Sequence, residues 1–364
     1  MERLTSQISS RFDMNIFFEK LYATRQKRPS LKAILLFSEI EPEELKDCVQ
    51  RRKKLAKLYN VNLTRLDDNL YRLNIKRLVW REIVSGCALI DTSFKNMWVI
   101  FCNEQSYFVK RALERLFTGL YPNISRLYLN YFKLQTLLNR IKEAYKGQTT
   151  LTFFIIKRAP KYPESYREQH KRELKGTVQL WEENAEEELR KQSEIYRVIV
   201  DMVNFEVKNK EGIVLLQAQI SRRGVCKLRF GSFSAFYKNV IQNALELGLK
   251  WKNFYGHRER IIQEGKILIR PLRIEYPFEL DEVQLQRLAK KISKIYSCSI
   301  IHGGNPYFVA ILCDYQEGSS FGVTALGKSV TITPITKGTS QATWKLTNRI
   351  QEILGDGEIT SILG

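Results

Sequence analysis

Residues 322–329 follow a pattern that could bind a nucleoside triphosphate. The segment GVTALGKS places Gly322, Gly327, Lys328 and Ser329 at the spacing of the P-loop, G-x-x-x-x-G-K-[ST]. A working P-loop follows a buried strand and opens a helix whose N–H groups hold phosphates. Here the next segment, VTITPITKG, is rich in β-branched residues and contains a proline, which indicates a strand. The sequence therefore predicts strand structure at this position, and we expect no cofactor.

A second set of residues could form the core of a metal-dependent nuclease. Such cores hold an Asp and a Glu-x-Lys on adjacent strands, where they bind a divalent ion and activate water. Asp201 begins an expected hairpin, but the position of the Glu-x-Lys reads QAQ at 217–219. Glu206 and Lys208 follow Asp201 so closely that Asp201 and Glu206 point to opposite faces of one strand. The segment resembles a PD-(D/E)xK nuclease whose lysine has been lost, and this alternative implies Mg²⁺ chemistry at Asp201, Glu206 and Lys208.

Charge is the strongest signal in the composition. The chain has 364 residues, with 59 Lys and Arg against 39 Asp and Glu, which gives a net charge of +20. The excess is +12 in residues 1–150, +1 in 151–193 and +7 in 194–364, so no single basic tail explains it. A chain this basic attracts polyanions, and each phosphate that it neutralises releases a counterion. We therefore predict DNA or RNA as the partner; the alternative is a basic scaffold that docks an acidic protein.

Three basic clusters and one turn are the candidate contact sites. The first cluster lies late in an expected helix at 41–59, and the third lies on one face of an expected helix at 281–295. The second, at 250–260, interleaves cations with aromatic residues that could stack on bases. Charge runs are also typical of solvated helix faces. The candidate nucleic-acid-binding residues are Arg51, Arg52, Lys53, Lys54, Lys57, Arg222, Arg223, Lys250, Lys252, Arg258, Arg260, Arg287, Lys290, Lys291 and Lys294.

The sequence also argues against several other classes of site. None of the six cysteines forms a C-x-x-C pair, and His170, His257 and His302 are far apart, so we expect no metal site. Scattered cysteines favour reduced thiols in a cytoplasmic protein. The first residues lack the apolar region of a secretory signal. No apolar run approaches the roughly 18 residues of a membrane span, so we expect no membrane partner.

Hydrophobic periodicity supplies the elements that must position these residues. Leu31–Ser38 is an apolar run typical of a buried strand. Strand runs at 196–207, 213–220 and 225–230 precede an amphipathic helix at 233–247. A similar alternation follows: a strand at 267–276, a helix at 281–295, short strands at 298–302, 306–314, 320–325 and 328–334, and a helix at about 340–354. The expected fold class is α/β and α+β: two units built from mainly antiparallel sheets with helices packed on one face. The expected domains are 1–150, a charged connection at 151–193, and 194–364, with a possible division into 194–262 and 263–364.

These observations lead to one leading hypothesis. The protein binds nucleic acid through phosphate-backbone contacts and acts as a non-catalytic subunit of a larger nucleoprotein complex with other protein subunits. The lack of a convincing catalytic constellation motivates the non-catalytic role. A prokaryotic defence or mobile-element complex is a further hypothesis that rests on the general frequency of basic proteins there. DNA and RNA, and single and double strands, stay open as partners.

Overall fold

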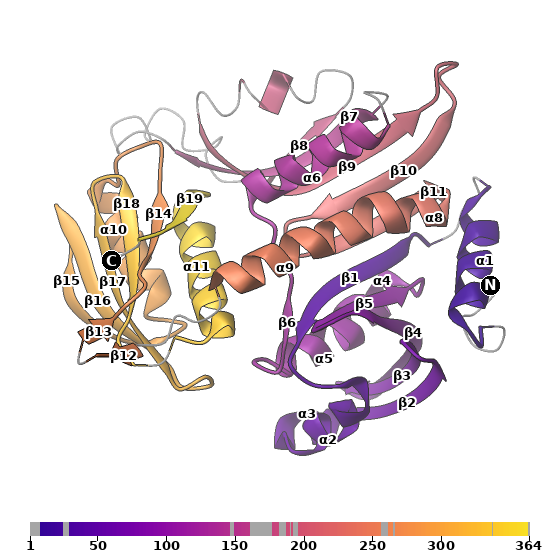
Figure 1. Ribbon diagram of the computed structural model, residues 1–364, viewed down its shortest axis with the longest axis horizontal. Coiled ribbons are helices and arrows are strands. Elements are labelled where there is room, and N and C mark those ends of the chain that lie inside the picture. Colours follow the sequence, from indigo (N-terminus) through magenta and orange to yellow (C-terminus); the bar gives the residue numbers. More distant parts are fainter. Residues whose placement is uncertain are drawn as a thin grey trace. The chain divides into compact units, whose positions relative to one another are not determined.

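The computed structural model describes residues 8–362 except 25–28, 146–148, 161–176, 182–186, 190, 192–195, 256–260, 265 and 337 (Figure 1). The side chains of 157–160, 177–181, 196–199, 251–253, 261–263 and 266–268 also lie outside this description. Contacts divide the chain into two units. Unit 1 comprises Met1–Ile155, Gln179–Glu186 and Val200–Gly248, and unit 2 comprises Ile156–Val178, Glu187–Ile199 and Leu249–Gly364.

Unit 1 is built around one large sheet. Its strand order is β2-β3-β4-β5-β1-β11-β10-β9-β7-β8, and β6 also pairs with β1. Every strand pairing with a defined register in the described residues of either unit is antiparallel, which confirms the predicted α+β class. The strands are β1 Leu31–Ser38, β2 Tyr59–Asp67, β3 Leu70–Val79, β4 Glu82–Phe94, β5 Met97–Cys102, β6 Ile124–Arg126, β7 Thr149–Pro160, β8 Thr177–Trp181, β9 Tyr196–Lys208, β10 Val214–Ser221 and β11 Val225–Gly231.

The helices of unit 1 cover both faces at the centre of this sheet. Strand β1 is buried along its whole length, as its apolar sequence predicts. Ile34 belongs to a core with Phe108 and Leu116, whereas Phe101 of the neighbouring β5 lies on the opposite face, in contact with Phe18 and Phe233. The first face meets α4 Ser106–Phe108, η2 Val109–Leu113 and α5 Glu114–Gly119; the second meets α1 Arg11–Tyr22, α8 Phe233–Phe236 and η4 Tyr237–Gln242. The chain then continues from η4 into α9, Asn243–Tyr255.

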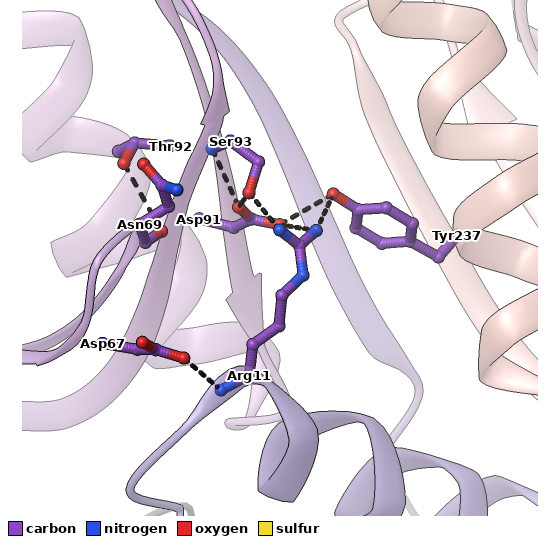
Figure 2. A network of polar contacts seen from close by, with 7 residues as sticks. All are labelled: Arg11, Asp67, Asn69, Asp91, Thr92, Ser93 and Tyr237. Carbon is purple, nitrogen blue, oxygen red and sulfur yellow. Dashed lines mark hydrogen bonds and ion pairs between the residues drawn. The ribbon is translucent and has the colours of Figure 1, made fainter.

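A polar network fastens helix α1 within unit 1 (Figure 2). Arg11 forms an ion pair of 3.0 Å with Asp91 of β4, and its guanidinium also donates to the hydroxyls of Ser93 and Tyr237. Asp91 accepts from Ser93 at 2.5 Å and from Tyr237 at 2.8 Å. The backbone N–H of Arg11 donates to Asp67 at 3.1 Å. Because Asp91 is only 2% exposed, these donors satisfy a carboxylate that would be costly to bury alone.

Unit 2 contains a six-stranded sheet in the order β15-β16-β17-β18-β14-β19 and a separate β12-β13 pair. The inward side chains of β16, such as Phe308 and Leu312, are buried, while Tyr307 and Ile311 on its other face are exposed. Helix α10 contacts β15 and β16 of this sheet, and it also packs against α11. The elements are β12 Ile261–Gln263, β13 Lys266–Leu268, β14 Leu272–Glu275, α10 Glu282–Ile292, β15 Ser297–Gly303, β16 Tyr307–Asp314, β17 Ser319–Leu326, β18 Ser329–Pro334, α11 Ser340–Leu354 and β19 Glu358–Ser361.

The segment that mimics a P-loop forms a β-hairpin, which confirms the prediction that a strand, not a helix, follows Lys328. Gly327 and Lys328 form the turn between β17 and β18, and Gly327 has a φ of 56°, a conformation that favours glycine. Ser329 begins a strand instead of a helix. The segment therefore lacks the helix N-terminus that holds phosphates in a nucleotide site.

The helix predicted at 41–59 is divided into three pieces. These are η1 Pro42–Glu44, α2 Leu45–Gln50 and α3 Lys53–Leu58. The break falls at Arg52, whose backbone is extended. Its guanidinium donates to the carbonyl oxygens of Gly119, Leu120 and Tyr121, so tertiary hydrogen bonds override the local helical pattern. Helix α6, Tyr131–Ala144, also belongs to unit 1.

The division into units differs from the boundaries suggested by the sequence. Residues 200–248 belong to unit 1, because β11 pairs with β1 through Leu31 and Leu228. The segment 151–193, expected as a connection, contains β8 and most of β7, which follow β9 in the strand order of the large sheet. Among the described helices, none has the length and hydropathy that a membrane span requires.

Candidate functional site

A cavity of about 430 Å³ lies in unit 1 between the sheet and the helix formed by η2 and α5. We call it the lysine pocket. Apolar lining comes from Val109, Ile155, Met202 and Val225. Five cations and two carboxylates also line it: Lys32, Lys110, Arg126, Arg223 and Lys227, with Glu114 and Asp201.

The register of four strands sets the floor of the lysine pocket. Lys32 of β1 lies opposite Lys227 of β11, Lys227 lies opposite Gln219 of β10, and Gln219 lies opposite Asn204 of β9. Side chains alternate along a strand, so Lys32 shares the face of Ile34 and Leu36 in the apolar core. These four polar residues therefore lie on the face of the sheet against which η2 and α5 pack.

The two central lysines are held in an unfavourable environment. Burial lowers the pKa of Lys32, which is 7% exposed, and its Nζ donates to the carbonyl oxygen of Glu104 at 2.9 Å. Burial also lowers the pKa of Lys227, and the positive charges of Lys32, Arg229 and Lys110 lower it further. Like charges directly opposite each other on neighbouring strands are destabilising. An anion in the pocket would relieve this repulsion.

Few of the cations in the pocket are neutralised by protein carboxylates. Arg126 forms an ion pair of 3.1 Å with Glu114. Within the described part of the chain, Lys110, Arg223 and Lys227 form no ion pair or side-chain hydrogen bond. The pocket therefore keeps a net positive charge that is available to a ligand.

Gln219 adds an unpaired polar group to this cationic floor. Its side chain is 1% exposed, and its Oε1 has no hydrogen-bond partner in the described residues. The Oδ1 of Asn204, its partner in the register, is also buried without a partner. An unsatisfied buried polar atom costs about 1–3 kcal/mol, so a ligand that donates to Gln219 would recover part of this cost.

Most of the sequence-predicted contact residues lie outside the lysine pocket. Among those whose side chains are described, only Arg223 lines it. The side chains of Lys252, Arg258 and Arg260 lie outside the described residues. The exposed members are Arg51, Lys53, Lys54 and Lys57 around α2 and α3, Lys250 in α9, and Arg287, Lys290, Lys291 and Lys294 in and after α10.

Two predicted contact residues have structural roles instead. Arg222 was expected to reach out from a hairpin tip, but it is 2% exposed and its guanidinium lies 4.8 Å from the ring centre of Tyr128. It also hydrogen-bonds the Tyr128 hydroxyl. Arg52 is half-buried by the carbonyl contacts that end α2. Arg222 is therefore not exposed at the hairpin tip, because its side chain packs against Tyr128 inside the protein.

The residues of the nuclease alternative do not gather into a metal site. Glu206 accepts from Gln217 at 2.9 Å and lies 3.8 Å from Lys208. Asp201 lines the lysine pocket, whereas Glu206 does not. In the described residues, no group of three or more His, Cys, Asp or Glu side chains is placed to hold a metal ion. This arrangement gives the nuclease alternative no structural support.

Sequence reasoning missed Lys32, Lys110, Arg126 and Lys227. A usable signal was present for Lys32, since it is the single charged residue in the buried run LKAILLFS. A lysine in a strand that is buried on both faces is unusual unless the residue is paired or functional. Lys227 carried a weaker signal, because its strand VCKLRFG also contains Arg229 and is only partly buried.

Comparison with known protein families and with curated proteins gave no match for this chain. The chemistry of the lysine pocket and of the surface around it is therefore the basis for a functional proposal.

Proposed function

We propose that this protein binds nucleic acid through phosphate contacts, and that the lysine pocket receives one of the phosphates. The observation that carries the proposal is the direct opposition of Lys32 and Lys227 in a pocket with unpaired cations. Two lysines held side by side against their repulsion are the arrangement expected where an anion completes the site.

Three further observations support this reading. The net charge of +20 favours association with a polyanion. The volume of about 430 Å³ suits a group of nucleotide size. The six cysteines are free thiols, four of them buried, which favours a reducing compartment such as the cytoplasm.

A salt-dependent binding experiment tests the proposal. Fluorescence anisotropy with labelled single-stranded and double-stranded DNA and RNA would be recorded over a series of salt concentrations. We expect the logarithm of the binding constant to fall linearly with the logarithm of the salt concentration. The slope for duplex DNA should be about −0.9 per neutralised phosphate. Addition of Mg²⁺ and analysis of the oligonucleotides on a gel would report any cleavage.

Matched variants assign the binding to the lysine pocket. Lys227→Gln should weaken binding and lower the salt slope by about 1. The control is Lys210→Gln, which removes the same charge from an exposed turn between β9 and β10. Equal binding by the two variants would remove the lysine pocket from the proposal, and failure of the wild-type protein to bind any of the four nucleic acids would overturn it.

A further inference from the structure

The tip of the hairpin between β3 and β4 exposes a tryptophan. The pair Val79 and Glu82 closes this hairpin, so Trp80 and Arg81 form a two-residue turn. Trp80 is 90% exposed. Leu78 and Ile83, which lie opposite each other in the register, are 45% and 70% exposed beside it. These three apolar side chains and Arg81 are called the hairpin tip.

Local stability does not explain a tryptophan at this position. Trp80 has a φ of 58°, in the left-handed region. Glycine is the usual residue where a two-residue turn requires a positive φ, and a bulky aromatic residue there is strained. Because the indole is exposed, packing against described residues does not offset this strain. A strained, exposed tryptophan is therefore evidence of a contact with another molecule.

The surroundings of the hairpin tip are cationic. Lys76 and Arg81 are exposed on the hairpin itself, and the acidic residue next to its turn is Glu82. Helix α3, which leads directly into β2, carries the exposed Lys53, Lys54 and Lys57 and contacts β3. An apolar aromatic group among cations matches the surfaces on which nucleobases stack while phosphates bind beside them.

The hairpin and the lysine pocket share one helix. Arg77 of β3 donates to the carbonyl oxygen of Arg111 in η2, and its guanidinium lies 5.1 Å from the ring centre of Tyr59. The same η2 segment supplies Val109 and Lys110 to the lysine pocket. A nucleic-acid strand with a phosphate in the lysine pocket would therefore lie beside η2, the helical segment that Arg77 of the hairpin contacts.

We propose that the hairpin tip stacks on unpaired nucleobases, so that the substrate is single-stranded nucleic acid or a duplex with a frayed end. This inference rests on the proposed function, and it names the class of nucleic acid. Trp80 supplies the stacking surface, and the cations of the hairpin and of α3 hold the neighbouring phosphates. A fully paired, blunt duplex hides its base faces and gains nothing from Trp80.

The test compares Trp80→Gly, Trp80→Phe and the control Tyr315→Ala, which removes another aromatic ring that is highly exposed. Anisotropy would measure the affinity for a labelled single-stranded oligonucleotide and for a blunt duplex. Trp80→Gly should weaken single-strand binding by about 5-fold to 150-fold, the range for loss of one base stack, and leave duplex binding unchanged. Trp80→Phe should retain most of the affinity.

Thermal unfolding separates lost binding from lost folding. Glycine fits the positive φ of Trp80, so the Tm of Trp80→Gly should equal or exceed that of the wild type. Single-strand binding by Trp80→Gly at the wild-type level would overturn the inference, and weakened binding by Lys227→Gln in the same series would leave the proposed function standing. If the wild type binds no nucleic acid, both proposals fail. Binding to phosphatidylserine vesicles that requires Trp80, with single-strand affinity unaffected, would assign the tip to membranes and overturn the inference.

Discussion

The Tyr237 hydroxyl donates a 2.8 Å hydrogen bond to Oδ2 of Asp91, across 146 residues of sequence. Tyr237 lies in the π-helical segment η4, and Asp91 lies in β4. Burial and the charge of Asp91 together raise the pKa of Tyr237, so the phenol stays protonated and remains a donor. This pair joins the helical layer to the sheet within unit 1 (Figure 2).

Replacement of Tyr237 by Phe should therefore destabilise the protein. Asp91 would keep its contacts with Arg11 and Ser93 but would lose one donor, and the expected cost is about 1–3 kcal/mol. Urea unfolding followed by circular dichroism would measure it. Tyr307→Phe, at an exposed position of unit 2, is the control, and an equal midpoint for the two variants would contradict a structural role of the pair.

Alkaline pH should reveal the contribution of Tyr59. Its hydroxyl donates to the carbonyl oxygen of Ala112 at 3.1 Å, and burial raises the pKa of Tyr59 to about 12 from 10.0. A raised pKa means that this stabilisation is complete below pH 10 and is lost as pH rises toward 12. At pH 8, we expect the free energy of unfolding of the wild type to exceed that of Tyr59→Phe by about 1 kcal/mol.

The pH series for Tyr59 includes its own control. The other tyrosines with raised pKa values titrate in both proteins, so the difference between wild type and Tyr59→Phe isolates one phenol. That difference, measured by urea unfolding from pH 8 to 11.5, should shrink above pH 10. A constant difference would show that Tyr59 ionises equally in the folded and unfolded states.

Replacement of Lys227 by Met should stabilise the free protein. The pKa of Lys227 is lowered in the folded state, so its positive charge opposes folding at neutral pH. This penalty begins to fall as pH rises past the lowered pKa and is gone above the ordinary lysine pKa of 10.5. Removal of the charge opposite Lys32 should add about 0.2–1 kcal/mol, the range of cross-strand pair energies. Urea unfolding at pH 7 would detect it, with Lys210→Met as the reference. A lower midpoint for Lys227→Met would show that the opposed lysines do not strain the sheet.

Arg52 and Lys54 should behave differently although both belong to one basic run. Arg52 donates to the carbonyl oxygens of Gly119 and Tyr121 at 2.7 Å, and Lys54 is exposed. Arg52→Met should lower the free energy of unfolding by about 1.5–3 kcal/mol, the value for hydrogen bonds from a charged group. Lys54→Met should leave it unchanged. Thermal unfolding of both variants would settle the assignment, and equal Tm values would refute it.

Local sequence patterns predicted the elements well where one residue type dominates. Leu31–Ser38 is a strand with the predicted bounds, because eight residues buried on both faces leave a continuous apolar run. The strand after Gly327 was predicted from a different signal, a segment rich in β-branched residues that contains a proline. The helix at 41–59 was wrong in its continuity, since the hydrogen bonds that break it at Arg52 come from residues near 120.

The lysine pocket could not be found in the same way. Its cations come singly from separate strands and from one helix, and they meet because Lys32 lies opposite Lys227 in a register that joins distant segments. The basic runs attract attention in the sequence, but a run on one helix spreads its charges over a solvated surface. Register between distant strands depends on the whole sheet, which no local window contains.

The pairing of β1 with β11 also has a consequence for synthesis of the chain. Leu31–Ser38 leaves the ribosome well before its partner strand, which ends at Gly231. Until that residue emerges, β1, which is buried along its whole length, has an unpaired edge where β11 will lie. About 200 residues of translation, at a typical 5–20 residues per second, therefore separate the synthesis of β1 from its pairing with β11. The free edge of β1 is open to wrong partners during this time.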